Sequence, residues 1–106
     1  MAQKHAQQKI IDIVLRFAEV IGKEKQVSKV ILYGSHSRGA HVIDSDIDVA
    51  VISPDFTGDR IEDQFWLLQK RRGIDLRIEP MPFRPEDFVL DDPFVREIVE
   101  TGIEVC

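Results

Sequence analysis

Residues 30–53 read VILYGSHSRGAHVIDSDIDVAVIS, and this stretch decides the fold. Two short apolar runs, at 30–33 and 47–52, predict buried strands. Gly34 permits a sharp turn after the first run, and Ser35 can cap a short helical turn whose free backbone N–H groups face outward. A turn of this kind binds anions such as phosphate.

Two carboxylates stand at the start of the second run. Asp46 and Asp48 are two residues apart, so an extended backbone points both side chains to one face. Mg²⁺ prefers a few carboxylates together with phosphate oxygens, and such metals align the reacting groups in phosphoryl transfer. A calcium loop is excluded, because its sixth position would be Val49 instead of glycine. The sequence therefore predicts a phosphate-binding turn beside a divalent-metal site.

The order and spacing of these two motifs resemble a known signature. A glycine-serine pair, ten residues and an Asp-Ile-Asp triplet follow one another as in the DNA polymerase beta-type nucleotidyltransferase superfamily. The segments YGSHSRG and SDIDVAV are similar to those of its minimal nucleotidyltransferase family of small prokaryotic proteins. The resemblance implies that Gly34, Ser35 and Arg38 bind the nucleotide phosphates. It also implies that Asp46 and Asp48 hold the divalent metal, Mg²⁺ or in its place Mn²⁺.

The family pattern expects a third carboxylate on a later strand. Residues 74–80, IDLRIEP, alternate apolar and polar side chains and predict that strand. Asp75 is the position that matches the family, and a carboxylate there would complete the metal site and activate the acceptor hydroxyl. Glu79 is the alternative, and the sequence leaves the choice open. The resemblance thus implies Asp46, Asp48 and Asp75 as catalytic residues and metal ligands, with a nucleoside triphosphate as substrate.

The remaining segments predict helices around this centre. Helical periodicity covers about residues 6–21 and 61–72, and a last helix begins near residue 93. Residues 80–88, PMPFRPEDF, hold three of the five prolines and predict an irregular connection. This order predicts a single mixed α/β (α+β) domain over residues 1–106. A small mixed central sheet would carry helices mainly on one side, as in the nucleotidyltransferase fold that the motif implies.

Composition limits the class of protein. The chain has 106 residues, 43% of them hydrophobic, and its formal net charge of −5 argues against a broad grip on nucleic acid. The one cysteine, Cys106, rules out an internal disulfide and a cysteine zinc cluster. No apolar run approaches the ~20 residues that cross a bilayer, and no signal sequence is recognisable. We therefore expect a cytoplasmic protein that makes no contact with a membrane.

Two functions are compatible with the resemblance. The first is a Mg²⁺-dependent nucleotidyltransferase that moves AMP from ATP onto a hydroxyl acceptor, such as a tyrosine of a HEPN-domain toxin. The second is an antitoxin that neutralises such a partner by complex formation, with little or no catalysis. All three aspartates are present, which favours the enzyme, a protein adenylyltransferase.

The short chain also suggests a second polypeptide. Larger members of the superfamily add domains that hold the base and present the acceptor, whereas this sequence ends soon after Val105. Because orientation of the reacting groups contributes strongly to rate, we expect an identical copy or a HEPN-domain partner to complete the site. The candidate contacts are apolar residues of the C-terminal half: Phe94, Val95, Ile98 and residues 81–83.

Overall fold

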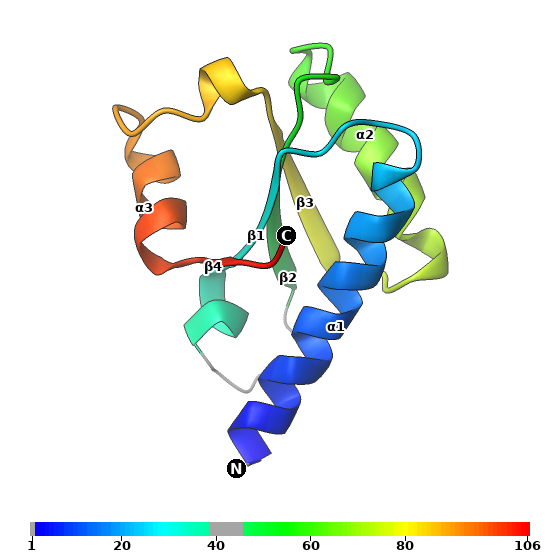
Figure 1. Cartoon of the computed structure of the whole chain (residues 1–106), viewed down its shortest axis with the longest axis vertical. Coiled ribbons are helices and arrows are strands. Elements are labelled where there is room, and N and C mark those ends of the chain that lie inside the picture. The colour runs from blue at the N-terminus through cyan, green and yellow to red at the C-terminus, as the bar shows by residue number, and fades with distance from the viewer. Residues whose placement is uncertain (1, 39–45) are drawn as a thin grey trace.

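A computed structural model describes residues 2–38 and 46–106, with the backbone alone for residues 2–6, 35 and 38. Within these residues the chain forms a mixed α/β fold, as the sequence predicts (Figure 1). The elements in order are α1 (Ala2–Gly22), β1 (Lys29–Tyr33), β2 (Ile47–Ile52), α2 (Arg60–Lys70), β3 (Ile78–Phe83), α3 (Pro93–Thr101) and β4 (Ile103–Glu104). Three short 3-10 helices join them: η1 (Gly34–Arg38), η2 (Arg71–Gly73) and η3 (Pro85–Asp87).

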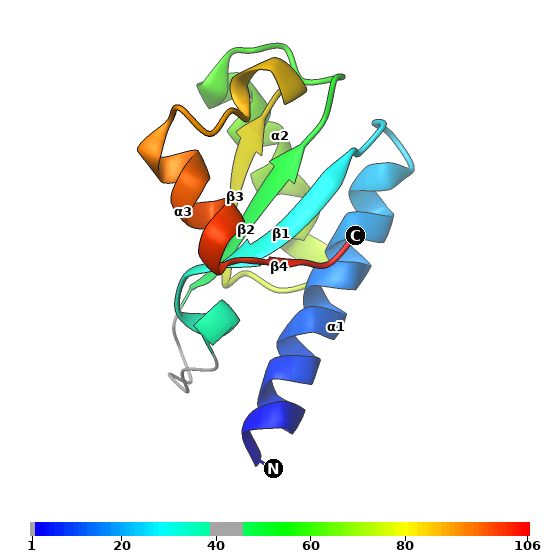
Figure 2. The same cartoon turned by 60° about the vertical axis from the view of Figure 1, so that its left-hand side comes forward.

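The strands form one mixed sheet in the order β3-β2-β1-β4 (Figure 2). Strand β1 is antiparallel to both β2 and β4, whereas β2 and β3 are parallel and are joined through α2. The end of β1 therefore lies at the same edge of the sheet as the starts of β2 and β3. Any side chains at these three strand ends are neighbours in space.

Helices cover both faces of the sheet (Figure 1). The larger core joins α1 and α2 to one face and includes Val14, Phe17, Ile21, Leu32, Val49, Val51 and Leu67. The smaller core joins α3 to the other face and includes Ile31, Ala50, Ile52, Phe83, Val95 and Ile98. Because strand residues alternate between faces, β2 is buried on both sides, which explains its nearly continuous apolar run.

The helix starts follow local capping chemistry. Asp59 caps α2 by accepting hydrogen bonds from the backbone N–H groups of Ile61 and Glu62. Asp92 accepts from the backbone N–H of Phe94 at the start of α3, where Pro93 takes the first helical position, as the sequence predicts.

The start of β3 differs from the prediction. Residues 74–77 form a turn in place of the predicted strand, because the backbone N–H groups of Ile74 and Asp75 both bond to the carbonyl of Arg71 and continue the turn of η2. Residue Leu76, expected on a buried face, is 66% exposed. Strand β3 instead runs into the proline-rich segment that predicted an irregular connection.

Prolines are tolerated in β3 because it is an edge strand. Two of its carbonyls bond to side chains from the α2 side of the sheet: Gln64 Nε2 donates to the Pro80 carbonyl at 3.1 Å and Arg71 Nη1 donates to the Ile78 carbonyl at 2.7 Å. Two prolines, Pro80 and Pro82, remove N–H donors from the strand. This edge is therefore poorly suited to pairing with another strand.

Candidate active site

A row of polar side chains crosses three strands at one edge of the sheet. Tyr33, the last residue of β1, pairs in register with Asp48 of β2, and Asp48 pairs with Glu79 of β3. Alternation along β2 places Asp48 on the same face as Ala50 and Ile52, the face that α3 covers. The two carboxylates are thus side by side on one face, at the strand ends.

Gly34 brings the turn of η1 against this row. Its φ of +76° lies in the left-handed region, and a Cβ atom there would stand 2.3 Å from Asp48 Oδ2. Only glycine permits this close approach without displacing the Asp48 side chain. The Ser37 hydroxyl donates to the Gly34 carbonyl at 2.7 Å, which fixes the first turn of η1. The predicted phosphate-binding turn and the predicted carboxylate are therefore in contact.

The other predicted phosphate ligands lie partly outside the described residues. For Ser35 and Arg38 the structure describes the backbone, within η1, and not the side chains. Their assignment as nucleotide-binding residues stays a prediction.

A residue that the sequence did not single out holds η1 from the other side. Gln7 of α1 donates from Nε2 to the backbone carbonyls of His36 and Ser37, at 3.2 and 3.3 Å. The His36 side chain is buried at 8% exposure. Gln7 lies 29 residues before His36 on an amphipathic helix, and no local sequence pattern marks it as a partner of the turn.

Negative charge is concentrated in this row. Burial raises the pKa of Asp48, and the neighbouring carboxylates of Asp46 and Glu79 raise it further, against a smaller opposing effect of His36. Burial, together with the charges of Asp48 and Glu79, raises the pKa of Tyr33 to about 12. Asp46 and Glu79 are therefore each close enough to Asp48 to repel its carboxylate, although Asp46 itself is exposed.

The donor atoms of this row fit a hard divalent cation. Carboxylate oxygens are the protein ligands that Mg²⁺ and Mn²⁺ prefer, and a cation would reverse the repulsion that raises the pKa of Asp48. Among the described residues, no three His, Cys, Asp or Glu side chains are placed so that together they could hold a metal ion. A cation at these carboxylates would therefore need phosphate oxygens or water as further ligands.

Asp75, which matches the family position, lies in a different environment. It precedes β3 and accepts from Arg77 three times: Oδ1 from the backbone N at 2.9 Å and from Nε at 3.0 Å, and Oδ2 from Nη2 at 2.7 Å. These hydrogen bonds hold the pKa of Asp75 below its usual range, and the charge of Arg16 in α1 lowers it further. Glu79, the alternative left open by the sequence, is the residue in register with Asp48.

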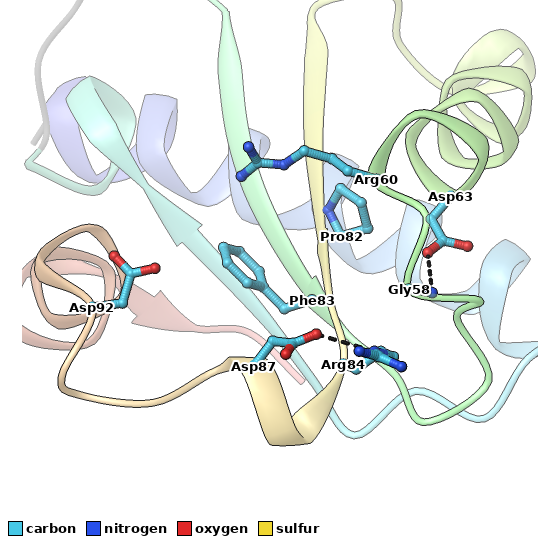
Figure 3. A pocket seen from close by; sticks show the side chains of 8 residues that line it. All are labelled: Gly58, Arg60, Asp63, Pro82, Phe83, Arg84, Asp87 and Asp92. Carbon is cyan, nitrogen blue, oxygen red and sulfur yellow. Dashed lines mark hydrogen bonds and ion pairs between the residues drawn. The ribbon is translucent and has the colours of Figure 1, made fainter.

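A cavity of about 200 Å³ opens farther along β3 (Figure 3). Its lining residues come from the loop before α2, α2 itself, the end of β3 and the segment before α3: Gly58, Arg60, Asp63, Pro82, Phe83, Arg84, Asp87 and Asp92. The side chain of Arg60 extends from the start of α2 across the sheet above Phe83. The positive charge of Arg60 lowers the pKa of Tyr33, in opposition to burial and to the charges of Asp48 and Glu79. The Arg60 guanidinium is therefore close enough to act on the row of polar side chains.

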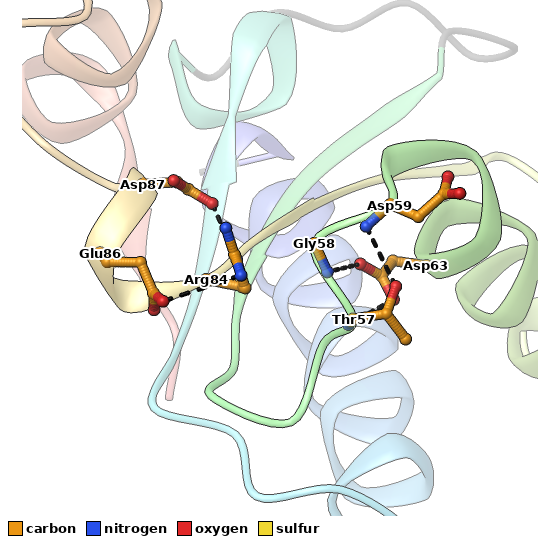
Figure 4. A network of polar contacts seen from close by, with 7 residues as sticks. All are labelled: Thr57, Gly58, Asp59, Asp63, Arg84, Glu86 and Asp87. Atoms are coloured by element: carbon orange, nitrogen blue, oxygen red, sulfur yellow. Dashed lines mark hydrogen bonds and ion pairs between the residues drawn. The ribbon is translucent and has the colours of Figure 1, made fainter.

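A buried carboxylate fixes one wall of this cavity (Figure 4). Asp63 accepts from the backbone N–H and hydroxyl of Thr57 and from the backbone N–H of Gly58, at 2.9 to 3.0 Å. A Cβ atom at Gly58, whose φ is +92°, would stand 2.8 Å from the guanidinium carbon of Arg84. Arg84 in turn pairs with Asp87 at 3.0 Å and Glu86 at 3.8 Å. The loop before α2 is therefore tied to both α2 and the segment after β3.

Comparisons with known proteins identify the family. The family model of the nucleotidyltransferase domain matches residues 10–104, nearly the whole chain, and the chain belongs to this family. A protein from Sulfolobus solfataricus described as a nucleotidyltransferase is similar in structure, with a TM-score of 0.67 and 16% identity, over 98% of this chain and 86% of that one. No curated protein matches the sequence at a significant level.

Two further solved structures are toxin-antitoxin proteins. One, crystallised with AMP-PNP, has a TM-score of 0.64 and 22% identity, over 91% of this chain and 72% of that chain. The other, a mutant of the toxin-antitoxin MntA-HpeT, has a TM-score of 0.59 and 22% identity, over 94% of this chain and 72% of that chain. At these identities the likeness establishes the fold, and the nucleotidyltransferase class predicted from the two motifs is confirmed.

One further expectation concerns the membrane. In the part of the chain that the structure describes, no helix is both long and apolar enough to cross a membrane.

Proposed function

We propose that the protein transfers AMP from ATP onto a hydroxyl acceptor, a tyrosine of a HEPN-domain partner, in a reaction that depends on Mg²⁺ or Mn²⁺. The observation that carries this proposal is the contact between the η1 turn and the carboxylate row, where a Cβ at Gly34 would meet Asp48 Oδ2 at 2.3 Å. A phosphate-binding turn against paired carboxylates suits a nucleoside triphosphate bound with a divalent cation. Family membership supports nucleotidyl transfer as the reaction class.

Each end of the triphosphate has a proposed set of partners. The backbone N–H groups at Gly34 and Ser35, with Arg38, bind the β- and γ-phosphates. Asp46 and Asp48 would hold the cation, with Glu79 as third carboxylate in the role that the family resemblance gave to Asp75. The register of β2 and β3 supports Glu79, since it lies directly opposite Asp48. When bound, the cation neutralises charge that develops on the phosphate oxygens.

The proposed chemistry is an in-line displacement at the α-phosphorus. The hydroxyl oxygen of the acceptor forms a bond to this phosphorus, and the bond to the oxygen that bridges the α- and β-phosphates breaks. Pyrophosphate leaves with that oxygen, and the hydroxyl proton passes to the Glu79 carboxylate.

The choice of ATP and of a protein acceptor draws support from the structural neighbours. One neighbour was crystallised with AMP-PNP, an ATP analogue, and that protein and another neighbour are toxin-antitoxin proteins. A partner protein in the cytoplasm would present its tyrosine to the open rim and exclude solvent from it. An identical copy of this chain is the other candidate for the second polypeptide.

Most of the apolar residues expected from the sequence to contact such a partner are buried in the fold, whereas Met81 and Phe94 are partly exposed. Val95, Ile98 and Phe83 are buried in the smaller core, and Phe94 packs against Tyr33 with ring centroids 5.8 Å apart. These residues serve the fold because α3 covers the second face of the sheet. The large apolar side chains that are exposed include Ile61, Phe65, Leu76, Val89, Leu90 and Val99.

The test is a transfer assay with a matched inactive variant. The protein is incubated with each Mg²⁺-nucleotide and with the product of the neighbouring gene, and both chains are analysed by mass spectrometry. The proposal predicts an AMP adduct on a tyrosine of the partner and release of pyrophosphate with ATP. The variant Asp48→Asn, which keeps the shape of the side chain, should give no adduct. Absence of an adduct with every nucleotide would contradict the proposal.

A second function is an antitoxin that acts by binding alone. The toxin-antitoxin neighbours favour this candidate as well, because complex formation is common to both. The two candidates differ in their need for the carboxylate row. If Asp48→Asn neutralises the partner as well as the wild type does, binding is the function and transfer is incidental.

A further inference from the structure

The geometry points to the cavity beside Arg60 as the acceptor subsite, which receives an aromatic hydroxyl side chain with its ring against the Arg60 guanidinium. This inference rests on the proposed nucleotidyl transfer and adds to it the place at which the acceptor side chain binds. The cavity belongs neither to the η1 turn nor to the carboxylate row. Its lining shares no residue with either of them.

The order of the strands fixes the side from which the acceptor must attack. The η1 turn follows β1, Asp48 lies on β2, Glu79 lies on β3, and β3 is the edge strand. If the η1 turn binds the β- and γ-phosphates, pyrophosphate leaves toward β1. In-line displacement then requires the hydroxyl to approach from the opposite side, over β3. The cavity lies along β3 toward the C-terminal end of the strand, four residues beyond Glu79, and the side chain of Arg60 extends from α2 across the sheet there (Figure 3).

Arg60 differs from the other cation of the cavity. Arg84 is engaged by Asp87 and Glu86, which raise its pKa and fix its position. Arg60 makes no hydrogen bond or ion pair to any residue within 2–38 or 46–106 whose side chain is described. Its guanidinium extends over the sheet, above Phe83, and its charge reaches Tyr33 in the carboxylate row. It is therefore available to a ligand that spans the cavity and the row.

The lining selects among hydroxyl acceptors. Pro82 and Phe83 give the cavity an apolar wall, and an open guanidinium stacks well on an aromatic ring. Asp87 and Asp92 stand on the rim, both exposed. Their charges would repel the phosphates of a nucleic-acid 3′ end and would attract basic residues beside the acceptor. A phenolic side chain on a basic protein segment matches this lining better than a nucleotide acceptor does.

A binding experiment tests the subsite without the need for turnover. N-acetyl-tyrosinamide is titrated into the ¹⁵N-labelled protein in the presence of Mg²⁺ and AMP-PNP, and backbone amide shifts are followed by NMR. We expect shifts at the amides of Arg60, Phe83 and Asp87, with N-acetyl-serinamide giving none. Arg60→Ala should weaken tyrosinamide binding about tenfold, the loss of one partly desolvated guanidinium contact.

The control variant removes the same positive charge at a position outside the cavity. Arg72 is exposed in η2 and does not line the cavity, so Arg72→Ala should bind tyrosinamide as the wild type does. Shifts centred elsewhere, an absence of shifts, or equal affinity in Arg60→Ala and the wild type would overturn the subsite. AMP-PNP should bind equally to all three proteins. Failure of the wild type to transfer AMP in the separate mass-spectrometry assay would instead overturn the proposed function, so the two failures are distinguishable.

Discussion

The two acidic residues near the start of β3, Asp75 and Glu79, lie in contrasting surroundings. Asp75 is held by the Arg77 side chain and backbone, and its pKa is lowered. Glu79 lies in register with Asp48, and its charge raises the pKa of that carboxyl. A carboxylate already satisfied by a guanidinium has little capacity left for a metal. A carboxylate that repels its neighbours gains from one.

The position of each residue relative to the sheet produces this difference. Asp75 belongs to the turn before β3, and the charge of Arg16 from α1 acts on it, so it is near the helix layer that covers the first face. Glu79 is in the strand and on the second face, with Asp48. Four residues of sequence thus separate a structural ion pair from the candidate active site.

The largest expected difference between Asp75 and Glu79 is in the rate of AMP transfer after each is replaced. Glu79→Gln should lower the rate of AMP transfer by about a thousandfold, because it removes a metal ligand and the proton acceptor. Asp75→Asn should change the rate only a few-fold, since its partner is Arg77. Rates of AMP incorporation at saturating Mg²⁺-ATP provide the comparison. A larger loss of rate in Asp75→Asn than in Glu79→Gln would make Asp75 the third carboxylate and would contradict the contrast between the two residues.

The next effect concerns the approach of η1 to Asp48. Gly34→Ala should destabilise the protein by about 2 to 3 kcal/mol, through its positive φ and the contact of the new Cβ with Asp48 Oδ2. Gly73→Ala is the matched control, because no atom lies within 4 Å of a Cβ there, and it should stay within about 0.5 kcal/mol of the wild type. Urea unfolding measures both. Equal effects of the two substitutions would mean that the turn does not press on Asp48.

A smaller effect is the opposite pH dependence of the two sites. The stability that Asp75 contributes is complete above its unfolded pKa, about 3.9, and is lost as the pH falls through its lowered folded pKa. The folded pKa of Asp48 is raised, so its contribution to stability depends on pH in the opposite direction. The folded state is favoured below the unfolded pKa, and that advantage is lost as the pH rises through the folded value.

Asparagine substitutions at these two sites should separate the two signs. At about pH 7 and without metal, Asp48→Asn should be more stable than the wild type by up to about 1 kcal/mol, a modest figure because the carboxylate is only half-buried. Asp75→Asn should be less stable than the wild type. The Asp48 difference should shrink as the pH falls through its raised folded pKa, and the Asp75 difference should shrink only at lower pH, as its lowered folded pKa is passed, in denaturant titrations. Shifts of the same sign at pH 7 would contradict the contrast between the two environments.

The smallest expected effect comes from the support of η1 by α1. Gln7→Ala removes two hydrogen bonds to the carbonyls of the turn and should weaken AMP-PNP binding about threefold, with little change in the chemical step. Gln8→Ala, which removes an exposed hydrogen bond to Asp12, is the control and should leave nucleotide binding unchanged. Isothermal titration calorimetry compares the two. A loss of binding in both variants would point to damage of α1 as a whole.

Periodicity and turn chemistry in the sequence predicted much of the fold. Local sequence patterns predicted β1 and β2 from their apolar runs, α1 from its helical spacing and the start of α3 from Asp92-Pro93. The tertiary packing agrees with each of these patterns. The spacing of Gly34 and Asp48 also anticipated their contact, because a strand end and a strand start at one sheet edge must be close.

The parts that could not be predicted depend on contacts from distant segments. Residues 74–77 alternate like a strand, but hydrogen bonds to Arg71 and the Asp75–Arg77 pair keep them in a turn. Strand β3 contains prolines that local propensity would exclude, and its place at the sheet edge makes them acceptable. Gln7 and Arg60 reach the site from helices, and neither position carries a motif. Their roles become visible only when the helices are placed against the sheet.

The location of the bound cation tests most directly whether Asp48 and Glu79 form the active site. Mn²⁺ is added in small amounts to the ¹⁵N-labelled protein with AMP-PNP, and its paramagnetism broadens the NMR signals of amides close to it. We expect the strongest broadening at Gly34, Asp48 and Glu79, with the signals of Asp75 and Arg77 much less affected. Broadening centred on Asp75 and Arg77, with Asp48 and Glu79 unaffected, would contradict the assignment of the carboxylate row as the active site.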